Sequence, residues 1–409
     1  MIITMLDWEE KEFETLYKIP SRNGLSKPSK IRGNGFKMIN MGELFANDRI
    51  YDIPMELVPC NEKEQENAKV ERNDLLFARQ SLVESGAGKC SIVMDVSDLT
   101  VFESHIIRVR LDEKIANPMF YYYYFKSGIS PMHSIVQHSV QAGIKASDLA
   151  KLPVIVPRIE IQNRIADFIS LIDTKIENNN HINRNLYELL AAMYKHDYLE
   201  EIANHEDWSE VTMDDITSKF ATGLNPRKNF VLGHGENYYV TIKNMNNNRV
   251  YLDSKCDMVD DEALIKINKR SDLQVGDLLF SGIGTIGRVH LIDEPPTKWN
   301  ISESVFTMRP SEVVSSEFLY LLLLSYDMQD YAVSLASGSV QKGIRMADLK
   351  RYKLYLPSKE DMDRLTATWK PLVAQIKKHE KENDELAVLR DSLLPKLMSG
   401  ELDVSDIDI

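Results

Sequence analysis

Cysteine is scarce in this chain. Only three of the 409 residues are cysteines, at positions 60, 90 and 256, and their spacing fits neither a disulfide framework nor a metal motif. No apolar run approaches the ~18–20 residues that a membrane-spanning helix needs. The first seven residues, Met-Ile-Ile-Thr-Met-Leu-Asp, lack the basic and apolar regions of an export signal. We therefore expect a reduced, cytoplasmic, soluble protein without a membrane partner.

Sequence motifs of catalytic sites are also lacking. The chain has no phosphate-binding G-x-x-x-x-G-K-[ST], no His-Glu-x-x-His and no Asn/Asp-Pro-Pro-aromatic tetrad of an amino-methyltransferase. Residues 282–287 (Gly-Ile-Gly-Thr-Ile-Gly) fit G-x-G-x-x-G, but residues 288–292 after them read as a strand. A dinucleotide site requires a helix there. The pattern favours a hairpin turn that brings backbone close to a ligand, with a nucleotide-binding enzyme as the weaker alternative.

Net charge is unevenly distributed. The total of −13 argues against a protein that binds polyanions over its whole surface. Between Lys18 and Lys37, however, there are six basic residues and no acidic one, whereas from Glu380 to the end nine acidic residues face three basic ones. The average therefore leaves room for local basic surfaces, although a solvated basic loop is the plainer alternative.

The most informative feature is a long internal repeat. Residues 139–149 (Ser-Val-Gln-Ala-Gly-Ile-Lys-Ala-Ser-Asp-Leu) return at 339–349 as Ser-Val-Gln-Lys-Gly-Ile-Arg-Met-Ala-Asp-Leu, with seven of eleven positions identical. Residues 73–77 (Asn-Asp-Leu-Leu-Phe) resemble 276–280 (Gly-Asp-Leu-Leu-Phe), each a turn followed by a buried strand. A solenoid unit recurs every ~20–50 residues, so a period near 200 predicts a duplicated domain.

Other segments match between the two copies. Residues 118–125 and 316–323 are both expected to form a buried helix. The tyrosines of the first could stack on nucleic-acid bases, but the second copy is rich in leucine there, so core packing is favoured. After the repeated motif, each copy runs through a strand to a proline, at position 157 or 357.

A heptad pattern follows each proline. Over residues 161–193 and 365–397, seam positions alternate spacings of four and three at a constant offset of 204, which predicts a coiled coil. At ~1.5 Å per residue each seam is ~50 Å long. Polar positions near the middle of each helix would meet if the helices were antiparallel, and would fix their register. These polar positions are Lys175, Asn179, His379 and Asn383, and Pro371 predicts that the second helix begins or kinks there.

The predicted seam residues come from both helices. They are Ile161, Ile165, Phe168, Ile172, Asn179 and Leu186 in the first, and Trp369, Leu372, Ile376, Asn383 and Leu393 in the second.

These patterns together predict an α+β fold. Two similar globular domains would be separated by a long antiparallel two-helix coiled coil, with approximate two-fold symmetry. The predicted boundaries are a first domain at 1–157, a helical region at 158–205, a second domain at 206–357, a second helical region at 358–400, and an acidic tail at 401–409.

Loops rich in basic and amide side chains follow matched positions in both domains. Lys and Arg position a protein on phosphates, while Arg, Lys, Asn and Gln read base edges. The candidate DNA contacts are Arg22, Lys27, Lys30, Arg32, Lys37, Arg79, Gln80 and Lys145 in the first copy, and Arg227, Lys228, Lys243, Asn244, Arg288, Lys342 and Arg345 in the second.

On these features the chain resembles the specificity (S) subunit of type I restriction–modification systems over essentially its full length. The resemblance rests on segments 73–77 and 276–280, the motif-to-proline segments 139–157 and 339–357, and the two heptad helices. It implies two target-recognition domains that each read one half of a split double-stranded DNA target, with the coiled coil as the ruler for the unread spacer.

The resemblance also implies partners. Two methyltransferase subunits would supply S-adenosylmethionine and adenine methylation, and motor–nuclease restriction subunits would use ATP and Mg²⁺. The chain itself would be non-catalytic and would hold no cofactor or metal. Besides the nucleotide-binding enzyme, two alternatives remain: the recognition subunit of another bipartite-target enzyme, in which modification and cleavage share one partner polypeptide, and a coiled-coil scaffold that binds no DNA.

Overall fold

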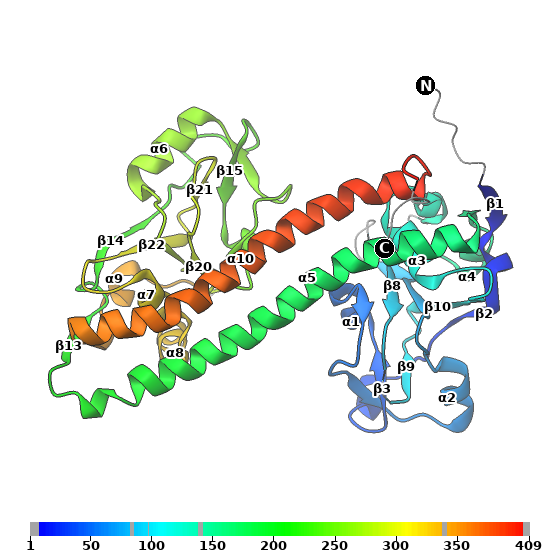
Figure 1. Ribbon diagram of the computed structural model, residues 1–409, viewed down its shortest axis with the longest axis horizontal. Helices are drawn as coiled ribbons and strands as arrows, with labels where there is room; N and C mark the ends of the chain where they lie inside the picture. The colour runs from blue at the N-terminus through cyan, green and yellow to red at the C-terminus, as the bar shows by residue number, and fades with distance from the viewer. Residues whose placement is uncertain (1–7, 82–85, 97, 138–141, 338–341, 404–409) are drawn as a thin grey trace. The chain divides into compact units, whose positions relative to one another are not determined.

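The computed structural model describes residues 8–81, 86–96, 98–137, 142–337 and 342–403 (Figure 1). The chain divides into two compact units. Unit 1 comprises residues 1–178 and 382–409, and unit 2 comprises residues 179–381. Two long helices, α5 (Ile159–Tyr194) and α10 (Lys359–Met398), each contribute one segment to either unit. Among the described residues, no helix is both long and apolar enough to cross a membrane.

Unit 1 is built on a five-stranded sheet with strand order β2-β10-β6-β8-β4 and a three-stranded sheet with order β5-β3-β9. In the smaller sheet β3 is parallel to β9 and antiparallel to β5. Two short antiparallel pairs, β1 with β12 and β7 with β11, lie beside them. The strands are β1 (Glu9–Glu12), β2 (Tyr17–Asn23), β3 (Phe36–Ile39), β4 (Arg49–Ile50), β5 (Glu56–Val58), β6 (Leu75–Ala78), β7 (Gln80–Ser81), β8 (Cys90–Val93), β9 (Thr100–Phe102), β10 (Ile106–Leu111), β11 (Ala142–Gly143) and β12 (Pro153–Val156). The short helices are α1 (Met41–Ala46), α2 (Glu62–Ala68), α3 (Pro118–Lys126) and α4 (Ala146–Ala150).

Unit 2 repeats this plan. Its sheets have the orders β14-β22-β19-β20 and β18-β15-β21, and β13 pairs with β23. In its three-stranded sheet β15 is again parallel to one neighbour, β21, and antiparallel to the other, β18. The strands are β13 (Ser209–Thr212), β14 (Thr217–Thr222), β15 (Asn237–Val240), β16 (Met245–Asn246), β17 (Arg249–Val250), β18 (Asp257–Val259), β19 (Leu278–Ser281), β20 (Val289–Leu291), β21 (Trp299–Ile301), β22 (Val305–Pro310) and β23 (Lys353–Leu356). The short helices are α6 (Asp261–Ser271), α7 (Ser316–Leu324), α8 (Tyr326–Ser334) and α9 (Met346–Leu349).

The predicted duplication and the α+β class are therefore confirmed. Each unit has a strand from its matched Asp-Leu-Leu-Phe segment, β6 or β19, at the centre of its larger sheet. Each also has a strand that ends just before the predicted proline, β12 or β23. The strands of the two units are equivalent because residues about 200 positions apart are buried in the same way in each unit.

A buried ion pair explains the aspartate that both copies share. The Asp74 carboxylate accepts from Nε and Nη2 of Arg110, both at 2.7 Å, and from the Glu71 backbone N–H at 2.7 Å. In unit 2 the Asp277 carboxylate accepts from Arg309 at 2.8 and 3.0 Å and from a backbone N–H three residues earlier, at 2.9 Å. Both carboxylates are fully buried, so the motif ties the turn to the neighbouring strand in each unit.

Segment 118–125 forms the buried helix α3, as predicted. The four consecutive tyrosines from Tyr121 to Tyr124 are at most 2% exposed and belong to the core of unit 1. The equivalent helix α7 is buried through its leucines. The prediction that these tyrosines pack in the core is confirmed, and burial leaves them no face for stacking on bases.

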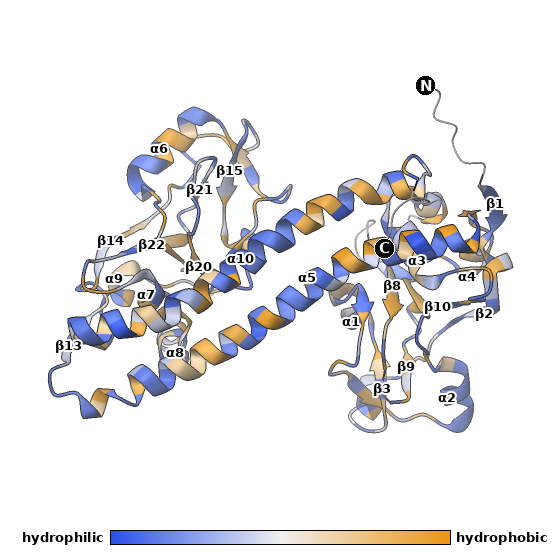
Figure 2. Ribbon diagram, in the orientation of Figure 1, coloured by the Kyte–Doolittle hydropathy of each residue, from blue (hydrophilic) through white to orange (hydrophobic). Residues whose placement is uncertain are grey.

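The segments of α5 and α10 pair antiparallel within each unit. In unit 1, Arg390 on α10 donates to Asp173 on α5 at 2.8 Å. In unit 2, the Nδ1 atom of His379 lies 2.8 Å from the Asn183 amide oxygen, and the ring of Trp369 lies 5.9 Å from that of Tyr194. Partner positions rise along one helix as they fall along the other, which is the antiparallel arrangement. Figure 2 shows apolar and polar residues alternating along both helices.

The seam residues are all buried or packed against a core. Ile165, Ile172, Asn179, Trp369, Ile376 and Asn383 are at most 9% exposed. Ile161, Phe168 and Leu393 are partly buried against the core of unit 1, and Leu186 and Leu372 against that of unit 2.

The helices match each other at an offset of 200, not 204. They begin at Ile159 and Lys359, and residues 165, 169, 179 and 183 are buried along with 365, 369, 379 and 383. The predicted offset was wrong by four residues because four is close to one helical turn, so both registers place apolar residues on one face. Lys175, expected in the seam, is half exposed and pairs with Glu382 at 3.2 Å.

Pro371 neither begins nor breaks α10, which starts twelve residues earlier and continues through it. A proline inside a helix removes one backbone hydrogen bond, so this position costs stability unless packing offsets it. The neighbouring Trp369 and Val373 are buried in the core of unit 2. The proposed division of the chain into recognition domains and separate helical regions stays a prediction, since the compact units each include part of both helices.

Candidate nucleic-acid interface

The repeated motif meets the loop that follows the matched strand in unit 1. The Ile144 backbone N–H donates to the Arg79 carbonyl oxygen at 2.9 Å, and Gly143 pairs with Gln80 between β11 and β7. A Cβ at Gly143 would lie 2.9 Å from the Arg79 oxygen, so the close approach favours glycine. Lys145 precedes α4 and is exposed. Three predicted contacts, Arg79, Gln80 and Lys145, are thus brought together.

The same junction occurs in unit 2. The Gly284 N–H donates to the Lys342 oxygen at 2.7 Å, and the Ile344 N–H donates to the Gly282 oxygen at 2.9 Å. Arg345 precedes α9 and, like Lys342, is exposed. Residues 138–141 and 338–341, which include the motif glutamines, lie outside the described residues. The junction thus presents one or two exposed cations in each unit.

The glycine-rich segment 282–287 is the turn of an antiparallel hairpin between β19 and β20, which confirms the predicted hairpin. Gly284 and Gly287 have positive φ values of 80° and 92°. A Cβ at Gly287 would lie 2.0 Å from Oε1 of Gln329, whose Nε2 donates to the Gly287 oxygen at 2.9 Å. Turn geometry and close packing therefore account for these glycines.

Fourteen of the fifteen predicted DNA contacts fall into three kinds in the structure, and the other, Gln80, lies in β7 opposite Gly143 of β11. The first kind consists of exposed cations on loops or at helix starts, whose ammonium or guanidinium groups are open to a phosphate. These are Lys30, Lys145, Arg227, Lys228, Lys243, Lys342 and Arg345.

The second kind is already paired within unit 1. Lys27 lies 2.8 Å from Glu64, Arg32 lies 2.6 Å from Glu56, and Lys37 lies 2.6 Å from Asp52. The hydrogen bond to Asp52 raises the pKa of Lys37, and the hydrogen bond from Lys27 lowers the pKa of Glu64. Arg22 donates to Asn67. A phosphate would have to compete with these carboxylates, so this basic stretch is less available than its composition suggests.

The third kind consists of side chains that hydrogen-bond to the backbone of a neighbouring segment and hold it in place. Arg288 donates to the carbonyl oxygens of Ile242, at 2.7 Å, and Met245. Asn244 is buried and accepts from the Thr241 N–H at 2.9 Å. Both hold the short 3-10 helix Ile242–Asn244, which presents the exposed Lys243. In unit 1, Arg79 similarly donates to the Ser104 oxygen at 3.3 Å.

One element of unit 2 was not anticipated as structure. Residues 245–250 form the hairpin β16–β17, with Asn247 and Asn248 at positive φ values of 47° and 58°. Two central residues at positive φ define a type I′ turn, for which asparagine is well suited. The Asn-Asn pair between short strands was the signal that could have revealed it. The turn leaves Asn246 and Asn247 exposed, with side chains of the type that reads adenine edges.

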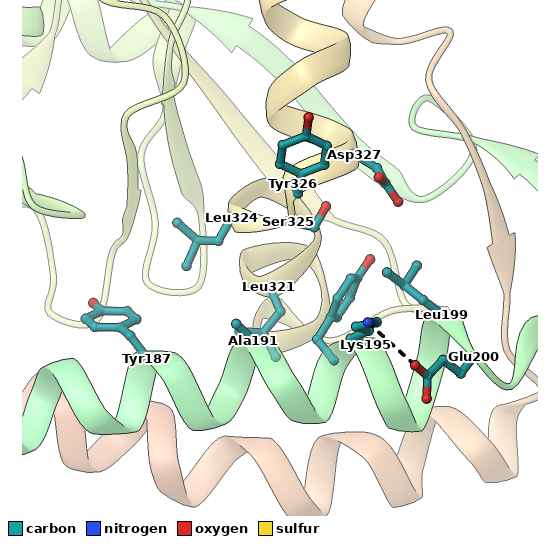
Figure 3. A pocket seen from close by; sticks show the side chains of 11 residues that line it. Tyr187, Ala191, Lys195, Leu199, Glu200, Leu321, Leu324, Ser325, Tyr326 and Asp327 are labelled. Carbon is teal, nitrogen blue, oxygen red and sulfur yellow. Dashed lines mark ion pairs between the residues drawn. The ribbon is translucent and has the colours of Figure 1, made fainter.

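Unit 2 also contains a cavity of about 450 Å³ beside α5. Figure 3 shows Tyr187, Ala191 and Lys195 of α5 and its extension on one side, with Leu321 and Tyr326 of α7 and α8 opposite. Its lining is mainly apolar, with the Lys195–Glu200 pair, 3.8 Å apart, at one end. None of the predicted DNA contacts lines this cavity.

Comparison with known proteins agrees with the duplicated architecture. The family model described as "Type I restriction modification DNA specificity domain" matches residues 5–188 and again residues 205–387. The type I restriction enzyme MjaIX specificity subunit of Methanocaldococcus jannaschii is 21% identical over 312 residues, covering 72% of this chain and 71% of the relative. The HindI specificity subunit of Haemophilus influenzae is 20% identical over 415 residues, covering 83% and 88%.

Among solved structures, the crystal structure of a type I restriction–modification system S subunit from M. genitalium aligns with a TM-score of 0.58 at 16% sequence identity. The alignment covers 97% of each chain. This likeness supports the fold. Because the family model matches two separate stretches that together span most of the sequence, the chain belongs to the type I restriction modification DNA specificity domain family and carries two copies of that domain.

Proposed function

We propose that this chain is the DNA sequence-recognition subunit of a type I restriction–modification complex, and that each of its two domains reads one half of a bipartite target. The observation that carries this proposal is the duplication. Both units share strand order and a buried Asp–Arg pair, while their exposed loops differ in sequence and structure. Two heads with one framework and different loops suit two different half-sites.

Within each head, the exposed cations position the domain on phosphates and the loop amides read bases. Lys145 in unit 1 and Arg345 in unit 2 occupy equivalent sites just before a short helix. We expect each to bind backbone phosphate next to its own half-site. The hairpin β16–β17, which has no counterpart among the described strands of unit 1, supplies exposed asparagines for readout in the second head.

The helices α5 and α10 act as the ruler for the unread spacer. Each passes from residues of one unit into residues of the other, so their length sets how far apart the half-sites lie. Inserting seven residues, about two helical turns, after Asn179 and again after Asn383 would keep the seam and lengthen the recognised spacer. An unchanged target in methylation mapping of this variant would contradict the ruler.

Catalysis then belongs to the partners. Two methyltransferase subunits supply S-adenosylmethionine and the methyl transfer, motor–nuclease restriction subunits use ATP and Mg²⁺, and the assembled complex works on double-stranded DNA in the cytoplasm. The support for a non-catalytic chain is the sequence, which lacks the motifs of methyltransferases and phosphate-binding loops.

A domain exchange tests the proposal. Residues 206–357 would be replaced by the equivalent segment of a relative, and the methylated sequences mapped genome-wide in cells with the partner subunits. One half of the target should change and the other should stay the same. If both halves changed, the two heads would not read independently, and if methylation did not depend on the chain at all, the recognition role would be wrong.

Point variants sharpen this test. Lys145→Ala and Arg345→Ala should each weaken binding of the complex to its DNA and reduce the salt dependence of the affinity by about one counterion per contact. Lys353→Ala is a suitable control, because that lysine is exposed but pairs with Glu210 at 2.7 Å on the β13–β23 pair. Equal loss with the control would show that general charge, not these two positions, governs binding.

A further inference from the structure

In unit 2, three side chains of types that commonly bind metals lie close together: His205, Asp207 and Asp361. Nδ1 of His205 lies 3.5 Å from an Asp207 carboxylate oxygen and 3.6 Å from Oδ2 of Asp361. His205 and Asp207 lie in the segment between α5 and β13, and Asp361 lies in the first turn of α10. Nothing in the proposed DNA-recognition role uses this cluster.

The separations match the edges of a metal coordination shell. Zinc binds imidazole nitrogen and carboxylate oxygen at about 2.0–2.2 Å, usually with tetrahedral geometry. In a tetrahedron of that size, ligand atoms lie roughly 3.3–3.6 Å apart. The two distances from His205 fall in this range, and one ligand atom from each of the three side chains lies within 4.8 Å of the others, so the two carboxylates need only close on a bound ion.

The histidine ring is held in a suitable orientation. It stacks on the Trp208 indole with centroids 4.5 Å apart and an interplanar angle of 19°. Its second nitrogen, Nε2, lies 3.8 Å from a Glu201 carboxylate oxygen. A carboxylate behind the free nitrogen of a metal-binding histidine fixes the tautomer and raises the basicity of the ligand. Glu201 would take this positioning role by moving closer to Nε2, since 3.8 Å is longer than a hydrogen bond.

Asp361 already has other partners, and these define what a metal must displace. Oδ2 accepts from the Trp208 indole N–H at 3.0 Å and from the Ser358 hydroxyl at 2.8 Å, and Oδ1 accepts from Arg364 at 2.9 Å. The Ser358 hydroxyl can rotate away, whereas the indole N–H and the guanidinium can stay. These bonds hold the pKa of Asp361 down at about 2, so its carboxylate is anionic at neutral pH.

The first copy lacks the cluster. Trp8 is the counterpart of Trp208, and its indole N–H has no hydrogen-bond partner among the described residues. At the offset of 200 that relates the two helices, Ile161 takes the place of Asp361, and Met5, which lies outside the described residues, takes the place of His205. The cluster is therefore an addition to the second copy and not a requirement of the shared fold.

We propose that His205, Asp207 and Asp361 form a binding site for a divalent transition-metal ion, zinc in the first place, with water as the fourth ligand. Donors of one imidazole and two carboxylates suit zinc, and the three come from segments on either side of the second recognition domain. The bound ion ties the segment after α5 to the start of α10 and so stabilises unit 2.

Metal binding to the full-length chain tests this directly, without DNA or partner subunits. The protein is stripped with EDTA, and Zn²⁺ is titrated by calorimetry while thermal unfolding is followed with and without the ion. We expect one zinc ion per chain at this site and a higher unfolding temperature with zinc. His205→Ala and Asp207→Asn should each lower the affinity at least about tenfold, and Glu201→Gln about 10–100-fold.

The matched control is His196→Ala. His196 also lies beside a carboxylate, 2.8 Å from Asp197, but is 77% exposed and belongs to no three-ligand group among the described residues. Its removal should leave zinc binding unchanged. A metal-free His205→Ala protein that unfolds at the same temperature as the metal-free parent would show that the variant is folded. No zinc binding by the parent, or equal binding by parent and His205→Ala, would overturn the proposal, whatever the outcome for DNA.

Discussion

The two units of this chain share their framework and differ in what they expose. Both have a larger sheet, of five strands in unit 1 and four in unit 2, and a smaller sheet of three strands. Both also have an ion pair from an arginine to the aspartate that precedes β6 or β19, and a close approach of a glycine to a backbone carbonyl. Between β3 and β5, unit 1 has helix α1 and strand β4, whereas between β15 and β18 unit 2 has the 3-10 helix Ile242–Asn244 and the hairpin β16–β17. Two recognition domains that arose by duplication and read different sequences would be expected to keep their framework and to differ in their loops.

The polar contacts made by the segments of α5 and α10 also differ between the two units. In unit 1, the buried Asp173 accepts from Arg390 at 2.8 Å and from the Tyr123 hydroxyl at 2.7 Å. In unit 2, Tyr187 bonds Tyr320 at 2.9 Å, and the buried Glu380 lies 3.1 Å from Lys377. Burial raises the pKa of Glu380, and Lys377 and Arg249 oppose that rise. The helix segments of each unit therefore make polar contacts that the equivalent segments of the other unit do not make.

The largest expected effect is on the shared framework. Asp74→Ala should cost about 2–4 kcal/mol of unfolding free energy, because it leaves the mostly buried Arg110 with only the half-exposed Glu71 as an acidic partner. Asp277→Ala should cost a similar amount through Arg309. Urea unfolding of both variants measures this. A loss in one copy only would show that the two pairs are not equivalent.

The next effect concerns the glycine that follows β2 or β14. A Cβ at Gly24 would lie 2.0 Å from the Phe102 oxygen, and one at Gly223 would lie 1.6 Å from the Ile301 oxygen. Alanine at either position should destabilise by about 2 kcal/mol or more, since backbone must move. Gly42→Ala is the control, because nothing lies within 4 Å of a Cβ there and the residue is in α1, where alanine is favoured.

A smaller loss of stability is expected when either of two contacts between α5 and α10 is removed, and the size of the loss should differ between them. Arg390→Leu leaves Asp173 buried with one fewer partner and should cost about 2–3 kcal/mol. His379→Leu removes the hydrogen bonds of the imidazole with Asn183 and Gln375 and should cost about 1–2 kcal/mol. Chemical denaturation of the two variants gives the comparison. If His379→Leu were the more damaging, the charged contact of unit 1 would not be the stronger tie.

The smallest effect is the contribution of one carboxyl group of unit 2, that of Asp361, to the pH dependence of stability. Hydrogen bonding from Trp208, with Arg364 and Ser358, lowers the pKa of Asp361 from its ordinary 3.8 to about 2. A carboxyl with a depressed folded-state pKa stabilises above its unfolded value, and that stability is lost as pH falls from about 4 towards 2. Asp361→Asn should flatten acid unfolding over this window. Ile161→Val, at the equivalent position in unit 1, should leave the pH dependence unchanged.

The sequence predicted the duplicated architecture well because repeated, buried residues leave a pattern. The Asp-Leu-Leu-Phe segments and the prolines 157 and 357 lie where the repeat placed them. The helix register was missed because a shift of four residues keeps a helical face nearly unchanged. The pairing of Lys27, Arg32 and Lys37 with carboxylates distant in the chain could not be read from local composition. Which loop residues contact bases stays a prediction.

Unit 1 is assembled from both ends of the chain, and this has a consequence for biosynthesis. Leu394, Leu397 and Met398, at the end of α10, belong to the same core as Ile165 and Ile169 near the start of α5. The N-terminal half of the protein therefore cannot complete its interior until the ribosome has released the last residues, whereas unit 2 is continuous and can finish earlier. A premature stop codon near residue 385 would thus destabilise unit 1, which is synthesised first, more than unit 2.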